Sequence, residues 1–100
     1  MKYIDWDEEK NQKLKEERNI SFEEVLVAIE DNQILDIVEH TNKDKYPNQK
    51  IIVVNINEYV YLIPFVEDEE KIFLKTIIPS HKATKIYLID PPIRRAGRRK

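Results

Sequence analysis

The two histidines of this sequence have the side chains that titrate nearest neutral pH, so they are the first candidates for proton transfer. His81 lies in the segment 80–84 (SHKAT), where an expected strand meets an expected helix. Amides at a helix N-terminus attract phosphate, and Lys82 would add positive charge. Metal-independent cleavage of a phosphate ester needs a base, an acid and cations that stabilise the phosphorane, and the resemblance described below implies that the ester is RNA. We therefore interpret His81 as acid or base and Lys82 as phosphate clamp. The alternative is that His81 is an exposed turn residue and Ser80 only a helix cap.

The other histidine, His40, opens a long polar segment at 40–50 (HTNKDKYPNQK) and is a second catalytic candidate. Long ordered loops often carry function. In this loop Tyr46 could stack on a base, while the asparagine and glutamine amides read base edges. The alternative is a solvated connection in which Tyr46 packs back onto the core. The sequence does not determine whether His40 and His81 approach each other.

Tyr59 and Tyr61 share one face of an expected strand, where they would form either a stacking platform or half-buried sheet surface. The acidic segment 67–70 (EDEE) has no metal-ligand spacing and is interpreted as a solvated turn. We expect neither a metal nor a cofactor. The candidate RNA-contacting residues are Tyr46, Lys50, Tyr61, Lys75, Ser80, Thr84 and Lys85.

Two helices are expected in the first third of the chain. Asp7 can cap a helix through about Arg18, with acidic residues in its first turn and basic residues towards its end. The segment 21–24 (SFEE) is a capping box, and Ile20 and Val25 are placed as a hydrophobic staple. This second helix would end near residues 31–32.

The rest of the chain changes to β-forming residues. Strands are expected at residues 34–39, 51–56, 59–66 and 72–78, with tight turns at residues 57–58 and 67–70. Tyr3-Ile4 could add an edge strand, and Ser80 could cap a short helix through about Leu88. The predicted fold is α+β. Two N-terminal helices pack on a four-stranded antiparallel sheet, a short C-terminal helix follows, and one sheet face is left for a ligand.

The composition predicts one small soluble domain at residues 1–90 and a basic, disordered tail at 91–100. Residues 1–90 carry 12 Lys or Arg against 19 Asp or Glu, an acidic balance unlike that of most nucleic-acid binders. The chain has no cysteine, which suits a reducing cytoplasm. No segment has the apolar run of a signal peptide or a transmembrane helix.

Three segments, in the correct order, resemble the BrnT family of bacterial toxins, which has the small RelE-like ribonuclease fold. Residues 4–11 (IDWDEEKN) resemble the family's aromatic-x-Trp-Asp opening, residues 20–24 (ISFEE) the start of its second helix, and residues 77–84 (IIPSHKAT) its Arg-Ile-Ile-Ser-x-Arg-x-Ala-Thr segment. The resemblance implies the toxin of a type II toxin–antitoxin system. Such a toxin is a metal-independent endoribonuclease, neutralised by a small partner of the ribbon-helix-helix type.

The chain departs from the family at its charged positions. Glu17-Arg18-Asn19 stands where the family usually has Lys-His-Gly, and Thr76 and His81 stand where it has arginines. The resemblance therefore supports the fold more strongly than the activity. A non-catalytic protein-binding module on the same fold is the alternative function, and a homodimer formed through an exposed strand edge is compatible with both.

Overall fold

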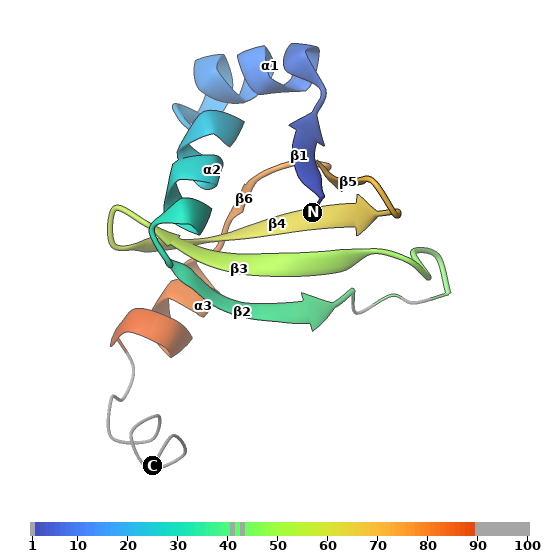
Figure 1. Cartoon of the computed structure of the whole chain (residues 1–100). Helices are drawn as coiled ribbons and strands as arrows, with labels where there is room; N and C mark the ends of the chain where they lie inside the picture. The colour runs from blue at the N-terminus through green and yellow to red at the C-terminus, as the bar shows by residue number, and fades with distance from the viewer. Residues whose placement is uncertain (1, 41, 43, 90–100) are drawn as a thin grey trace.

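The computed structural model describes residues 2–40, 42 and 44–89, so the expected tail at 91–100 lies outside the described residues. Figure 1 shows the chain as one mixed α+β unit, which confirms the predicted fold class. The elements follow in the order β1 (Tyr3–Trp6), α1 (Glu8–Arg18), α2 (Phe22–Glu30), β2 (Ile34–Glu39), β3 (Lys50–Ile56), β4 (Tyr59–Glu67), β5 (Lys71–Leu74), β6 (Ile78–Pro79) and α3 (His81–Thr84). A π-helical turn (Lys85–Ile89) continues α3, so the last helix ends close to the expected position.

The sheet is mixed, and the prediction of a four-stranded antiparallel sheet was wrong. Its strand order is β1-β5-β4-β3-β2, and β6 also pairs with β4. β1 precedes the helices and pairs in parallel with β5, whereas the other pairings are antiparallel. The strand expected at 72–78 is divided into β5 and β6. Between them the chain leaves β4 at Pro64, which has no amide to donate, and Ile77 turns into the core with none of its surface exposed.

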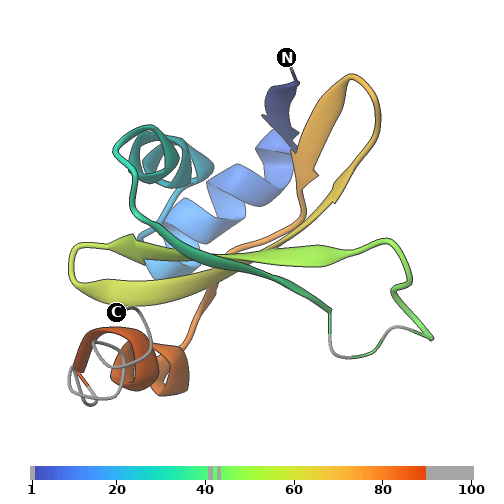
Figure 2. The same ribbon diagram turned by 60° about the horizontal axis from the view of Figure 1, so that its bottom comes forward.

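The two long helices cover one face of the sheet, and α3 lies on the opposite face (Figure 2). The main core lies under α1 and α2 and includes Phe22 and Val25 of α2 and Ile63 of β4. Val53 and Val60 are buried outside this cluster, on the α3 side. The expectation of a second face left open to a ligand is therefore wrong for the part that α3 covers.

The local signals predicted the helix ends and the hairpin correctly. Asp7 accepts a hydrogen bond from the Glu9 amide at 3.0 Å, and the Ser21 hydroxyl accepts one from the Glu24 amide at 3.2 Å. The tight turn at Asn57 and Glu58 has φ of 55° and 65° at these residues. Two consecutive residues with positive φ are what a two-residue hairpin of type I′ requires.

Asn11 joins the two long helices through a fully buried side-chain amide. Its exposed fraction is 0%. Its Oδ1 accepts a hydrogen bond from the backbone amide of Phe22 at 2.8 Å, and its Nδ2 donates to Oε1 of Glu23 at 2.9 Å. The first amides of a helix have no partner within the helix, so Asn11 both caps α2 and fixes its position against α1.

We expect Asn11→Leu to lower the free energy of unfolding by about 1–3 kcal/mol, because it leaves the buried Phe22 amide without an acceptor. Urea denaturation followed by circular dichroism measures this loss. Gln12→Leu is the matched control on the exposed side of α1 and should change the stability by less than about 0.5 kcal/mol. Equal losses in the two variants would contradict the role of Asn11.

The same amide also sets the titration of Glu23. The hydrogen bond from Asn11 is the main reason that the pKa of Glu23 lies below its ordinary value of 4.5, and Lys15 contributes through its charge. Because the pKa is lowered in the folded state, this carboxylate stabilises the fold above its ordinary pKa and loses that effect as the pH falls through the lowered value. In an NMR titration, we expect the Glu23 midpoint to rise in Asn11→Leu and to stay unchanged in Gln12→Leu. An unchanged midpoint in Asn11→Leu would assign the shift to another group.

Candidate functional site

The junction between β6 and α3 is held to β4 by backbone hydrogen bonds. The Ser80 amide donates to the carbonyl of Val60 at 3.0 Å, and the Ser80 hydroxyl accepts from the Ala83 amide at 3.0 Å. Ser80 is thus the N-cap of α3, as expected. The Ala83 amide, one of the helix N-terminal amides expected to attract phosphate, is therefore already bonded to the Ser80 hydroxyl.

Thr84 anchors α3 on strand β4 of the sheet. Its side chain is buried, with 4% exposure, and its Oγ1 accepts from the Val60 amide and donates to the Ser80 carbonyl, both at 2.8 Å. The hydroxyls of Thr84 and Ser80 are therefore used inside the protein. Both residues therefore hold α3 in position and are not arranged to face RNA.

Three of the other candidates share α3 and the turn that follows it. His81, Lys82 and Lys85 are exposed, and none of them forms an ion pair within the described residues. Lys75, just after β5, is also exposed, and its ammonium lies 5.8 Å from the centroid of the Phe73 ring. The structure thus leaves these cations available to a ligand in solution.

Charge is divided unevenly along the chain, which the sequence analysis overlooked. Residues 1–70 contain eight Lys or Arg and 18 Asp or Glu, whereas residues 71–89 contain four Lys, one His and no acidic residue. The second range forms β5, β6, α3 and the π-helical turn. Among the residues that the structure describes, the acidic body therefore has one cationic segment, and that segment includes His81 and Lys82.

His40 and Tyr46 lie together in the loop between β2 and β3. Their rings are 4.4 Å apart, and His40 Nδ1 accepts a hydrogen bond from the Asn42 amide at 3.1 Å. Tyr46 is half-buried against His40, so one side of its ring is already covered. Lys50 begins β3 and lines a polar cavity of about 580 Å³ beside this loop.

The two histidines lie at opposite ends of the sheet. The His40 amide bonds the Gln49 carbonyl, next to the pair formed by Lys50 and Phe65, while α3 begins level with Val60. Val60 and Phe65 are five residue steps apart along β4, or roughly 17 Å at the usual rise. Figure 1 likewise shows α3 and the β2–β3 loop at opposite ends. In this arrangement the two histidines do not act on the same bond.

Tyr59 and Tyr61 form an edge-to-face pair with ring centroids 5.6 Å apart. Both are half-buried, and Tyr61 packs against the main core. Burial is the first reason that the pKa of the Tyr61 phenol is raised, followed by the charge of Glu24 and the neighbouring Tyr59. Tyr61 therefore belongs mostly to the sheet surface, with part of its ring left for stacking.

Arg18 is a cation near this surface that the sequence analysis treated only as a helix-end charge. Its Nη1 donates to the carbonyl of Ile77 at 2.7 Å. This bond ties the end of α1 to the segment that leads into β6 and α3. The two residues are 59 positions apart, so no local pattern could have indicated the contact.

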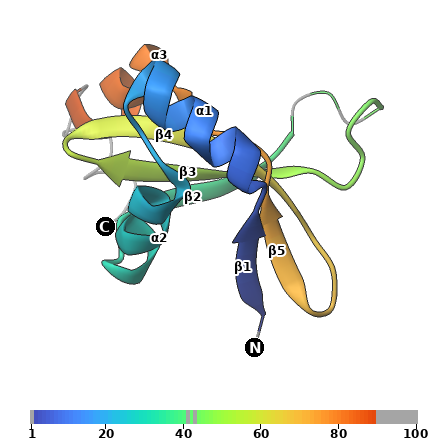
Figure 3. The ribbon, with the colours of Figure 1, turned by 90° about the horizontal axis from the view of Figure 1, so that it is seen from above.

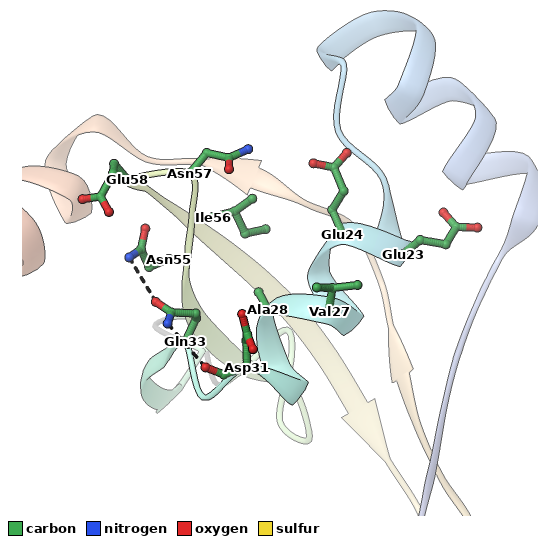
Figure 4. A pocket seen from close by; sticks show the side chains of 10 residues that line it. All are labelled: Glu23, Glu24, Val27, Ala28, Asp31, Gln33, Asn55, Ile56, Asn57 and Glu58. Carbon is green, nitrogen blue, oxygen red and sulfur yellow. Dashed lines mark hydrogen bonds between the residues drawn. The ribbon is translucent and has the colours of Figure 1, made fainter.

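A second concave site lies between α2 and the β3–β4 turn. It has a volume of about 530 Å³, and no residue of α3 lines it (Figure 4). Its charged lining residues are all acidic: Glu23, Glu24, Asp31 and Glu58. Sequence reasoning did not find this site, because its residues come from segments that only the fold brings together.

No protein-family model, curated protein or solved structure matches this chain. Among residues 2–40, 42 and 44–89, no group of three or more histidines or carboxylates is arranged to hold a metal ion. The same residues contain no helix long and apolar enough to cross a membrane.

We expect Thr84→Val to destabilise the docking of α3, because the buried Val60 amide loses its acceptor at a cost of about 1–3 kcal/mol. Hydrogen exchange at the α3 amides should become faster, while the α2 amides keep their protection. Thr84→Ser retains the hydroxyl and serves as the control. Unchanged exchange in Thr84→Val would show that this hydroxyl does not hold α3.

Proposed function

We propose that this chain is the toxin of a type II toxin–antitoxin pair and cleaves RNA at the surface of α3. The observation that carries the proposal is the cationic segment Lys71–Ile89, which lacks acidic residues and places His81 and Lys82 on an exposed helix. RNA binding depends on phosphate contacts with Lys and Arg. Within the described part of the chain, which is otherwise acidic, this segment is where a phosphate chain can approach.

The reaction proposed is attack of the ribose 2′-oxygen on the adjacent phosphorus. A bond forms between the 2′-oxygen and phosphorus, and the bond from phosphorus to the 5′-oxygen breaks, giving a 2′,3′-cyclic phosphate and a 5′-hydroxyl end. His81 transfers one of the two protons involved, and water carries the other. Lys82, with Lys75 and Lys85 nearby in sequence, stabilises the charge on the phosphorane oxygens.

The resemblance to the BrnT family supports this proposal, and one backbone detail agrees with it. Asn19 stands where the family usually has glycine, and it has φ of 56° and ψ of 39°, a left-handed conformation. Glycine and asparagine adopt this conformation most readily. The proposed neutralising partner is a small protein of the ribbon-helix-helix type, as the resemblance implies.

We expect His81→Ala to slow cleavage of a fluorescently labelled RNA by about 100-fold or more, the usual contribution of a general acid or base. Lys82→Ala should also reduce the cleavage rate. The rate of this variant should change less with salt concentration than the wild-type rate does. The assay contains EDTA, and the products should carry cyclic phosphate ends. His40→Ala and Lys13→Ala, a histidine and a lysine placed elsewhere, are the matched controls and should keep the wild-type rate.

Intact RNA after incubation with the isolated wild-type chain would contradict the ribonuclease and favour the second candidate, a non-catalytic protein-binding module. One observation favours this candidate: the edge strand β2 exposes three large apolar side chains, those of Ile34, Ile37 and Val38. An exposed strand edge can pair with a partner. Co-purification of a partner does not separate the two candidates, because a neutralised toxin also forms a complex.

A further inference from the structure

The acidic groove between α2 and the β3–β4 turn has the size of a binding site. Its volume of about 530 Å³ falls within the range of ligand pockets. Figure 4 shows α2 on one side, carrying Glu24 and Val27, and the turn with Asn57 and Glu58 on the other. Ala28 and Ile56 add apolar surface to the lining.

The charged groups of the groove accept hydrogen bonds but donate none. Glu23 is already bonded to Asn11 and lies 3.8 Å from Lys15. Asp31 and Glu58 are exposed, and neither side chain has an ion pair within the described part of the chain. A ligand that fills the groove would therefore gain most by bringing positive charge and hydrogen-bond donors.

A buried oxygen in the groove lining points to the same conclusion. The Asn55 Nδ2 donates to Oε1 of Gln33 at 3.2 Å, while the Asn55 Oδ1 is buried and has no partner in the described residues. Figure 4 shows the Asn55 nitrogen turned toward Gln33 and the oxygen turned away from it. Buried acceptors of this kind are rare in folded proteins, and among the described residues the groove lining keeps one polar atom without a donor.

The groove also has an apolar component that a simple cation would not use. Val27 lies in the middle of α2, yet 60% of its surface is exposed. Glu23 and Asp31 are four residues before and after it, so the three side chains follow one stripe of the helix. Such a stripe fits a polypeptide segment in which an apolar side chain is flanked by Lys or Arg.

We propose that this groove binds a basic segment of a partner protein, with an apolar side chain of that segment seated on Val27, Ala28 and Ile56. Glu24, Asp31 and Glu58 bind its cations. Identifying this partner as the neutralising protein rests on the proposed function, whereas binding of a basic segment does not. The groove residues come from α2, the segment after it, β3 and the β3–β4 turn, so the partner would bind residues other than the cations proposed to bind RNA.

The other acidic surface, the turn between β4 and β5, is the natural comparison. Two of its four carboxylates are engaged: Glu67 bonds Lys2, and Asp68 accepts from the amides of Glu70 and Lys71 at 2.8 and 2.9 Å. Both carboxyl groups have pKa values lowered by these bonds. A basic segment therefore gains less at this turn than in the groove.

The test uses the full chain and a short fluorescein-labelled peptide of alternating lysine and leucine. Fluorescence anisotropy should show saturable binding, which Glu24→Gln, Asp31→Asn and Glu58→Gln together weaken by about tenfold or more. Glu16→Gln, Glu69→Gln and Glu70→Gln remove the same charge elsewhere and should have a much smaller effect. Val27→Ser should weaken binding without changing the circular dichroism spectrum. Carbodiimide crosslinking should join the peptide lysines to Glu24, Asp31 or Glu58.

Equal weakening by the two triple variants would attribute binding to net charge and overturn the proposal. Crosslinks confined to residues 67–70 would overturn it as well. A dimer of the wild-type chain that becomes a monomer in the groove variant would identify a second copy as the occupant and would also reject a partner's basic segment. The RNA assay separates the two proposals: peptide binding without cleavage rejects only the ribonuclease, and cleavage without binding rejects only the groove.

Discussion

The position of α2 depends on one buried amide, that of Asn11. A side chain with no exposed surface must satisfy its polar atoms inside the protein, and Asn11 does so with the first amide of α2 and with Glu23. This fixes the angle at which α2 leaves α1. Because α2 supplies Phe22 and Val25 to the core and one wall of the acidic groove, both the core and the groove follow from this contact.

A second buried polar group performs the same task on the opposite face. Thr84 holds α3 against β4 through the amide of Val60, so the protein attaches its elements to both sides of the sheet with single polar side chains inside apolar surroundings. Polar side chains also bond backbone amides in the two edge strands of the sheet. Asp5 in β1 and Asp36 in β2 each accept a hydrogen bond at 2.8 Å from the amide of the next residue. An edge amide satisfied in this way is less available to a foreign strand.

The sequence predicted the features that depend on neighbours along the chain and missed those that depend on distant segments. The caps at Asp7 and Ser21 and the turn at Asn57 are local patterns, and the structure confirms them. The parallel pairing of β1 with β5 joins residues nearly 70 positions apart, which no local pattern encodes. The burial of Asn11 was missed for the same reason, since a surface helix with little apolar content gives no sign of a buried amide. The helix start at Ser80 and His81 was predictable, whereas the distance between His81 and His40 was not.

Under the proposed function, the uneven charge would let an acidic protein approach RNA. The mean field of the body repels phosphate, so binding depends on the local field of Lys75, Lys82 and Lys85 within a Debye length of about 8 Å at physiological salt. The acidic groove is near the cationic segment, because Glu58 in its wall is two residues from Val60, whose amide bonds Thr84 of α3. Under the two proposals, repulsion by the body would disfavour phosphate at the acidic surfaces, and the same field would attract a basic partner to the groove. Opposite charges on different elements would then let one small domain distinguish a nucleic acid from a protein.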